Sequence, residues 1–148
     1  MAVLSANVRM DHRADTLVRT EVLAAVTDVF YGGAAIWWST TAEGVTPVCA
    51  SGTEFAGFCE EQVSATMAVT KIKLVNGVFK IPTAGASAQA TQGQFVYGDA
   101  SAGSDNPADL IFTGTASGDV GVGVALEYVS STSCWMDSRV RTLPTVVA

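Results

Sequence analysis

The stretch Thr70-Lys-Ile-Lys-Leu-Val-Asn-Gly-Val-Phe-Lys-Ile-Pro82 carries the clearest fold signal in this chain. Apolar and polar residues alternate on both sides of Asn76-Gly77, and such alternation is typical of half-buried strands. An Asn-Gly pair between two such runs is the strongest short-range signal for a β-hairpin, because both residues tolerate positive φ. The stretch therefore predicts two antiparallel strands joined by a two-residue turn.

A hairpin in this register would separate apolar side chains from basic ones. The predicted pairs are Leu74 with Phe79 and Ile72 with Ile81 on the apolar face, and Lys73 with Lys80 on the other face, with Lys71 beside them. Like charges directly opposite each other cost stability. The pattern leaves two interpretations. The lysine face is solvated, or it is a basic surface that meets an acidic partner, although this chain itself has a net charge of -6.

The rest of the chain alternates short apolar segments with turn residues, which predicts a compact all-β sandwich or barrel of short strands. We expect an extended N-terminal arm over residues 1–19 and a single β domain over residues 20–148, a length that suits one core. Residues 15–30 fit a helix and a strand about equally, because the valines follow helical spacing but also suit a strand. Strands are expected at 34–38, 46–50, 55–60, 70–75, 78–81, 95–97, 110–112, 120–128 and 133–140.

Composition indicates a largely neutral surface. Charged residues make up 15% of the chain and the mean hydropathy is +0.34, which favours a subunit of an oligomer or large assembly over a monomer with a plain Ser/Thr/Ala surface. No apolar run approaches the roughly 20 residues that cross a bilayer. Residues 1–15 show no secretory signal, so we expect synthesis in a cytoplasm and no membrane partner.

The residues that usually carry enzyme chemistry are sparse. The only histidine, His12, has no adjacent nucleophile, and an exposed role is favoured. Glu60 and Glu61 are a weak candidate for a catalytic carboxylate pair, because adjacent strand residues point to opposite faces. The three cysteines, Cys49, Cys59 and Cys134, show no metal-ligand spacing and are expected to be buried free thiols.

Cofactor and nucleic-acid signals are equally weak. The glycines of Gly121-Val-Gly123 lack the third glycine of a dinucleotide loop. The loop 99–109 lacks the repeated acidic positions of calcium loops, so a polar turn is favoured over a metal site. A sequence pI near 4.5 opposes phosphate binding. We therefore expect no enzyme activity, no cofactor, no metal and no direct contact with nucleic acid.

Five segments, taken in order, resemble the small capsid decoration (cement) proteins of tailed bacteriophages. They are Asn7-Val-Arg-Met-Asp-His-Arg-Ala-Asp15, Phe55-Ala-Gly-Phe58, Gly77-Val-Phe-Lys-Ile-Pro82, Gly93-Gln-Phe-Val-Tyr97, and Val120-Gly-Val-Gly-Val124 before Glu127. The resemblance implies a compact β domain on the outside of the virion head, often a homotrimer, that strengthens the shell by bridging copies of the major capsid protein.

On this resemblance, we expect the N-terminal arm and the lysine face to meet the shell. The expected partner-interface residues are Arg9, His12, Arg13, Arg19, Lys71, Lys73, Lys80, Trp37 and Trp38. The alternative is an adhesion or carbohydrate-binding module of a phage tail or cell surface, with Trp37, Trp38 or Tyr97 as its platform.

Overall fold

The computed structural model describes residues 4–66, 70–82, 93–112, 119–130 and 132–140. They form antiparallel strands and two short 3-10 helices, η1 (Ala14–Thr16) and η2 (Pro107–Asp109), so the predicted all-β class is confirmed. The strands are β1 (Val18–Leu23), β2 (Val29–Phe30), β3 (Ala35–Trp38), β4 (Val45–Thr46), β5 (Phe55–Cys59), β6 (Val63–Ser64), β7 (Lys71–Asn76), β8 (Val78–Pro82), β9 (Phe95–Gly98), β10 (Val120–Ser130) and β11 (Ser133–Asp137).

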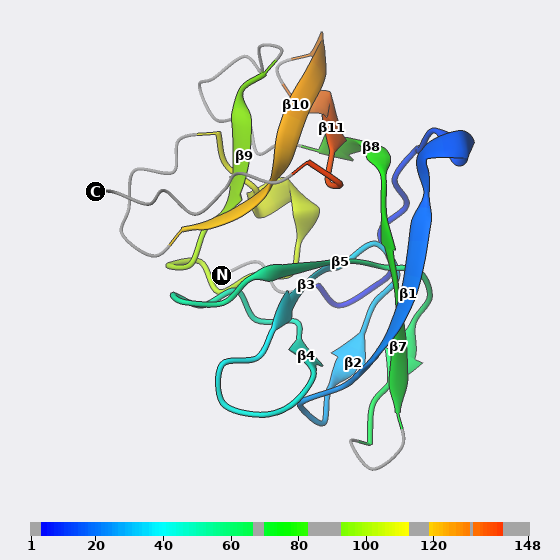
Figure 1. Ribbon diagram of the computed structural model, residues 1–148, viewed down its shortest axis with the longest axis vertical. Coiled ribbons are helices and arrows are strands. Elements are labelled where there is room, and N and C mark those ends of the chain that lie inside the picture. Colours follow the sequence, from blue (N-terminus) through cyan, green and yellow to red (C-terminus); the bar gives the residue numbers. More distant parts are fainter. Residues whose placement is uncertain (1–3, 67–69, 83–92, 113–118, 131, 141–148) are drawn as a thin grey trace.

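Two sheets form a sandwich, with a small third sheet on one side. The five-stranded sheet has the order β1-β7-β5-β3-β4, the four-stranded sheet β8-β11-β10-β9, and the third sheet pairs β2 with β6. Figure 1 shows the four-stranded sheet in the upper part of the molecule and the five-stranded sheet below it. The main core lies between them and includes Phe55, Phe58, Phe79 and Val122.

The five-stranded sheet is buried on both faces at its central strand β5, whereas its edge strand β1 is largely exposed. Ile36, Ile72 and Leu74 point away from the main core and pack with Phe30 of β2 in a second core. Every residue of β5 is therefore buried, as expected of a central strand covered on both sides. This explains why β5 reads as a continuous apolar run rather than as an alternating one.

The predicted hairpin at Asn76-Gly77 is wrong. β7 pairs with β1 and β5, whereas β8 pairs with β11 in the other sheet. The two strands follow one another through a corner, so Leu74 and Phe79 lie in different cores. Lys73 lies opposite Glu21 and Lys80 opposite Trp135, and the expected lysine pair does not form.

The corner needs glycine because of close approach rather than because of backbone conformation. Gly77 is not among the positive-φ glycines, but a Cβ there would lie 2.9 Å from Leu17 Cδ2 and 3.0 Å from Thr16 Oγ1. Strands that pass from one sheet to the next commonly do so through such bends. The Asn-Gly pair therefore marks a change of sheet.

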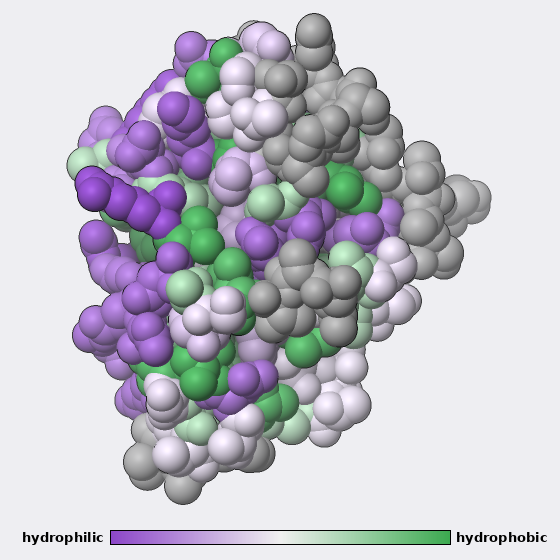
Figure 2. Space-filling view, turned by 180° about the vertical axis from the view of Figure 1, so that it is seen from behind, coloured by the Kyte–Doolittle hydropathy of each residue, from purple (hydrophilic) through white to green (hydrophobic). Residues whose placement is uncertain are grey.

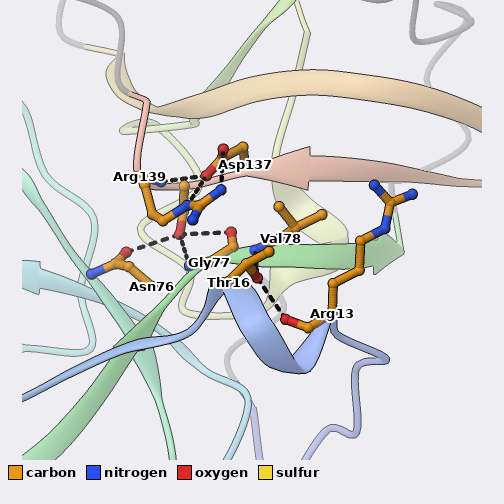
Figure 3. A network of polar contacts seen from close by, with 8 residues as sticks. Arg13, Thr16, Asn76, Gly77, Val78, Asp137 and Arg139 are labelled. Carbon is orange, nitrogen blue, oxygen red and sulfur yellow. Dashed lines mark hydrogen bonds and ion pairs between the residues drawn. The ribbon is translucent and has the colours of Figure 1, made fainter.

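Hydrogen bonds from both neighbouring segments hold this corner (Figure 3). Val78 donates its backbone N–H to Thr16 Oγ1 at 3.0 Å, and Gly77 donates its N–H to Ser138 Oγ at 3.0 Å. The Ser138 hydroxyl donates to Asn76 Oδ1 at 2.9 Å, and the Ser138 N–H donates to the Gly77 carbonyl at 2.9 Å. The corner is thus fixed by the end of β11 on one side and by η1 on the other.

The remaining differences from the predicted strands are local. Residues 15–30, which fitted helix and strand equally, form β1 and β2. The strand expected at 110–112 is reduced to a single bridge between Ile111 and Tyr97. The expected boundary after residue 19 falls within β1.

Candidate functional site

The N-terminal segment is extended, as expected, but it is held by its own domain. Val8 donates its N–H to the Gly32 carbonyl at 2.8 Å, Lys80 donates to Asp11 at 2.9 Å, and Arg13 donates to Val78 at 3.0 Å. The segment therefore runs along β8 and covers the edge of the four-stranded sheet. Residues 1–3 lie outside the described part of the chain.

A cleft of about 490 Å³ lies between this segment and the five-stranded sheet. Its lining combines apolar side chains from both sheets and the N-terminal segment with a charged rim. The apolar side chains include Met10, Leu17, Phe58, Val75 and Phe79, and the rim includes Arg9, His12, Arg19, Glu60 and Glu61. Arg9, Arg19 and the adjacent Glu60 and Glu61 thus place charge around one recess.

Two further recesses continue the cleft. One, of about 660 Å³, shares Arg19, Glu60 and Glu61 with the cleft and adds Glu21, Lys71 and Lys73. The other, of about 260 Å³, shares Arg9 and adds Asp11 and Lys80. The three recesses form one surface, which we call the charged face. It comprises Arg9, Asp11, His12, Arg13, Arg19, Glu21, Glu60, Glu61, Lys71, Lys73, Lys80 and Glu127. Figure 2 shows hydrophilic residues along its left margin, the side of β1 and β7.

Ion pairs within the charged face neutralise half of its basic groups. Arg19 Nε lies 2.9 Å from Glu60 Oε2, and Lys73 Nζ lies 3.2 Å from Glu61 Oε1. The hydrogen bond with Glu61, together with the charge of its carboxylate, raises the pKa of Lys73. The lysines therefore belong to a surface of mixed charge, and the uniformly basic face expected from the hairpin does not exist.

Arg13 extends the charged face onto the outside of the four-stranded sheet. Its guanidinium lies 3.1 Å from Glu127 Oε2 and 4.7 Å from the centre of the Trp135 ring. Trp135 is the cross-strand neighbour of Lys80. Arg13 therefore lies over the ring of the residue that pairs with Lys80.

Seven of the nine expected interface residues lie on the charged face, and the two tryptophans do not. Trp37 is 1% exposed and packs edge-on against Phe55 with ring centres 5.2 Å apart, so it belongs to the core and not to any surface. Trp38 is 39% exposed, but it lies on β3, two strands away from β7 in the sheet order.

The sequence interpretation missed the acidic half of this surface. Glu60 and Glu61 follow β5 in a bend, so both reach the same cleft instead of pointing to opposite faces as strand residues would. The pairing of Glu21 with Lys73 follows from the position of β1, which no short-range signal indicates.

The three cysteine thiols are shielded from solvent. All three cysteines are buried and free, as predicted. Burial raises the pKa of Cys49 to about 12 and those of Cys59 and Cys134 to about 11, so these thiols are poor nucleophiles. Among the described residues, no cluster of three or more His, Cys, Asp or Glu side chains has the geometry to hold a metal ion.

No family model, curated protein or solved structure matches this chain. Within the described residues, no helix has the length and apolar character to cross a membrane.

Proposed function

We propose that this chain is a virion structural protein that decorates the outside of a phage capsid and stabilises it by bridging shell subunits, without catalysis. The resemblance of five ordered segments suggests this class of protein. The observation that carries the proposal is the charged face, which gathers six of the eight basic residues of a chain with net charge -6. The net negative charge of the chain therefore lies outside the charged face, and an acidic partner surface would bind most favourably to the charged face.

Three basic side chains are available for such a partner without breaking the fold. Arg9, Lys71 and Lys80 have no ion-pair partner among the described residues. The ion pairs of Arg13, Arg19 and Lys73 are exposed, and exposed pairs contribute only about 0–1 kcal/mol each. Carboxylates of the shell can replace those partners at little cost to stability.

The mechanism is physical. Many copies that bind only the assembled shell stabilise that state by mass action. The partly buried apolar side chains of Met10 and Leu17 in the cleft provide area that a shell segment can bury, and the charged rim sets its orientation.

The test is binding to heads that lack this protein, measured over a range of salt concentrations. The variant Arg9→Gln/Lys71→Gln/Lys80→Gln is expected to bind less and to lose part of its salt dependence. Glu54→Gln, an exposed charge change outside the charged face, is the matched control. Unchanged occupancy and an unchanged salt profile in the triple variant would show that the charged face is a solvated surface with no role in binding. Failure of the wild type to bind heads would contradict the proposal.

An adhesion or carbohydrate-binding module is the second candidate, and the exposure of Trp38 favours it. An exposed indole can stack on a sugar ring. Quenching of tryptophan fluorescence by added oligosaccharide, lost in Trp38→Ala, would support this function.

A further inference from the structure

Among the residues that the structure describes, β1 is an edge strand of the five-stranded sheet and has only β7 as a neighbour in its ladder. Five of its six residues are exposed, including Val18 at 52%. An exposed edge of this length is a template for pairing with another strand. Its composition identifies the strand that fits it best.

The backbone groups of Arg19 and Glu21 point away from the sheet. Ala24 donates its N–H to the Thr70 carbonyl at 3.1 Å, which places the backbone of Ala24 toward β7. In an antiparallel ladder, successive residues point alternately toward and away from the partner strand. The ladder has no register shift, so Thr20 and Val22 face β7 while Arg19 and Glu21 face outward.

We propose that two copies of this chain pair through β1, antiparallel, about a two-fold axis at Thr20. In this register Arg19 of one copy lies opposite Glu21 of the second copy, and the reverse pair forms by symmetry. Both residues present outward N–H and C=O groups, so each pair exchanges two backbone hydrogen bonds. The two five-stranded sheets then become one continuous sheet.

Charge selects this register over its neighbours. A shift of two residues in one direction sets Arg19 against Arg19, and a shift in the other sets Glu21 against Glu21. Like charges directly opposite each other are destabilising, whereas opposite charges stabilise the pair. A shift of one residue would place the outward N–H and C=O groups of one copy opposite residues of the second copy whose N–H and C=O groups point toward their own β7. The hydrogen-bond ladder between the copies could then not form.

Charged residues on both sides of β1 continue this alternation across the junction. Lys73 lies opposite Glu21 on β7, and Arg19 lies 2.9 Å from Glu60. Each row across the dimer therefore runs Lys73, Glu21, then Arg19 and Glu60 of the second copy, with alternating sign.

The other side of β1 adds apolar contact. Val18 of one copy lies opposite Val22 of the second copy, in the closely spaced, non-hydrogen-bonded type of pair. Pairing over residues 18–22 therefore covers Val18, one of the most exposed large apolar side chains described. It ends before Leu23, whose carbonyl faces Gly44 of the same chain.

The test is the mass of the purified protein by sedimentation equilibrium and native mass spectrometry up to roughly 100 µM, a range that detects micromolar association. The wild type is expected to show a monomer–dimer equilibrium. Arg19→Glu and Glu21→Arg each create two like-charge pairs, so each variant alone is expected to associate at least about tenfold more weakly.

Mixing the two variants gives the decisive result, because the mixed pair has opposite charges at both positions. A heterodimer formed from Arg19→Glu and Glu21→Arg, each monomeric alone, supports the two-fold register. Glu54→Arg is the control and is expected to dimerise like the wild type. If Arg19→Glu unfolds through loss of its Glu60 pair, Glu21→Gln tests the same contact with a neutral residue.

A wild-type monomer at the highest concentration would overturn the proposal, and so would a trimer, which the family resemblance implies. Equal association of the wild type and both charge variants would also overturn it. The inference does not depend on the proposed capsid function, since it concerns the protein in isolation.

Discussion

Removing the Ser138 hydroxyl tests whether Asn76-Gly77 is a corner between sheets. Ser138 is 0% exposed, and its Oγ accepts the Gly77 N–H at 3.0 Å and donates to Asn76 Oδ1 at 2.9 Å. In Ser138→Ala the buried Gly77 N–H loses this acceptor, which costs about 1–3 kcal/mol. For a domain of this size, a loss of about 2 kcal/mol lowers Tm by roughly 4–8 °C.

The assay is urea unfolding combined with amide hydrogen exchange. We expect a lower denaturation midpoint with an unchanged m value, and faster exchange at Gly77. Ser101→Ala is the matched control, because the Ser101 hydroxyl is exposed and, within the described part of the chain, bonds only to Asp99 of its own loop, at 2.6 Å. This variant is expected to change stability by less than about 0.5 kcal/mol. Equal effects of the two variants would refute the corner, since a hairpin would leave Ser138 without a role at Gly77.

Three further predictions concern the core and the buried acids and thiols. In Gly98→Ala the new Cβ would overlap the buried Trp37 ring, so we expect the free energy of urea unfolding to fall by about 1–3 kcal/mol. Gly32→Ala, whose Cβ meets only ordinary contacts from 3.5 Å outward, is the control and is expected to be tolerated. Equal losses of stability in the two variants would contradict the packing of Gly98 against Trp37. Burial raises the pKa of Asp105, so its contribution to stability is present in acid and is lost as the pH rises through the folded-state pKa. Asp105→Asn keeps an acceptor for the Leu4 N–H, so this variant is expected to be more stable than the wild type at neutral pH and equally stable in acid. A gain in stability that does not depend on pH would show that burial of the Asp105 charge is not its cause. Because burial raises the pKa of each cysteine thiol, we expect the native protein to resist iodoacetamide at mildly alkaline pH and to react at three sites once unfolded; rapid native labelling would show the thiols to be accessible.

Much of the fold can be predicted from local patterns, because strand signals are local. The apolar segments around Ile36, Phe58 and Val122 are strands as expected. The connection at Gly77 could not be predicted, since the same Asn-Gly pair suits a tight turn and a close approach. The contacts that decide between them come from Thr16, 62 residues away in sequence from Val78, and from Ser138, 61 residues away from Gly77.

The candidate site was predictable in its basic residues and not in its acidic ones. Arg9, Arg19 and Lys80 stand out in a chain with few cations, and they do share one surface. Glu60 becomes a neighbour of Arg19, and Glu127 of Arg13, only through sheet pairing and the path of the N-terminal segment. Trp37 was misjudged because a strand with both faces buried gives no polar alternation to mark its inner side.

The proposed function is tested most directly by the copy number of this chain in purified particles from its source, measured by quantitative mass spectrometry against the major shell protein. The account predicts a ratio near one, or a simple fraction of it, as decoration of the whole head requires. A handful of copies per particle would place the chain at the tail and favour the adhesion alternative, and its absence from particles would contradict the account altogether.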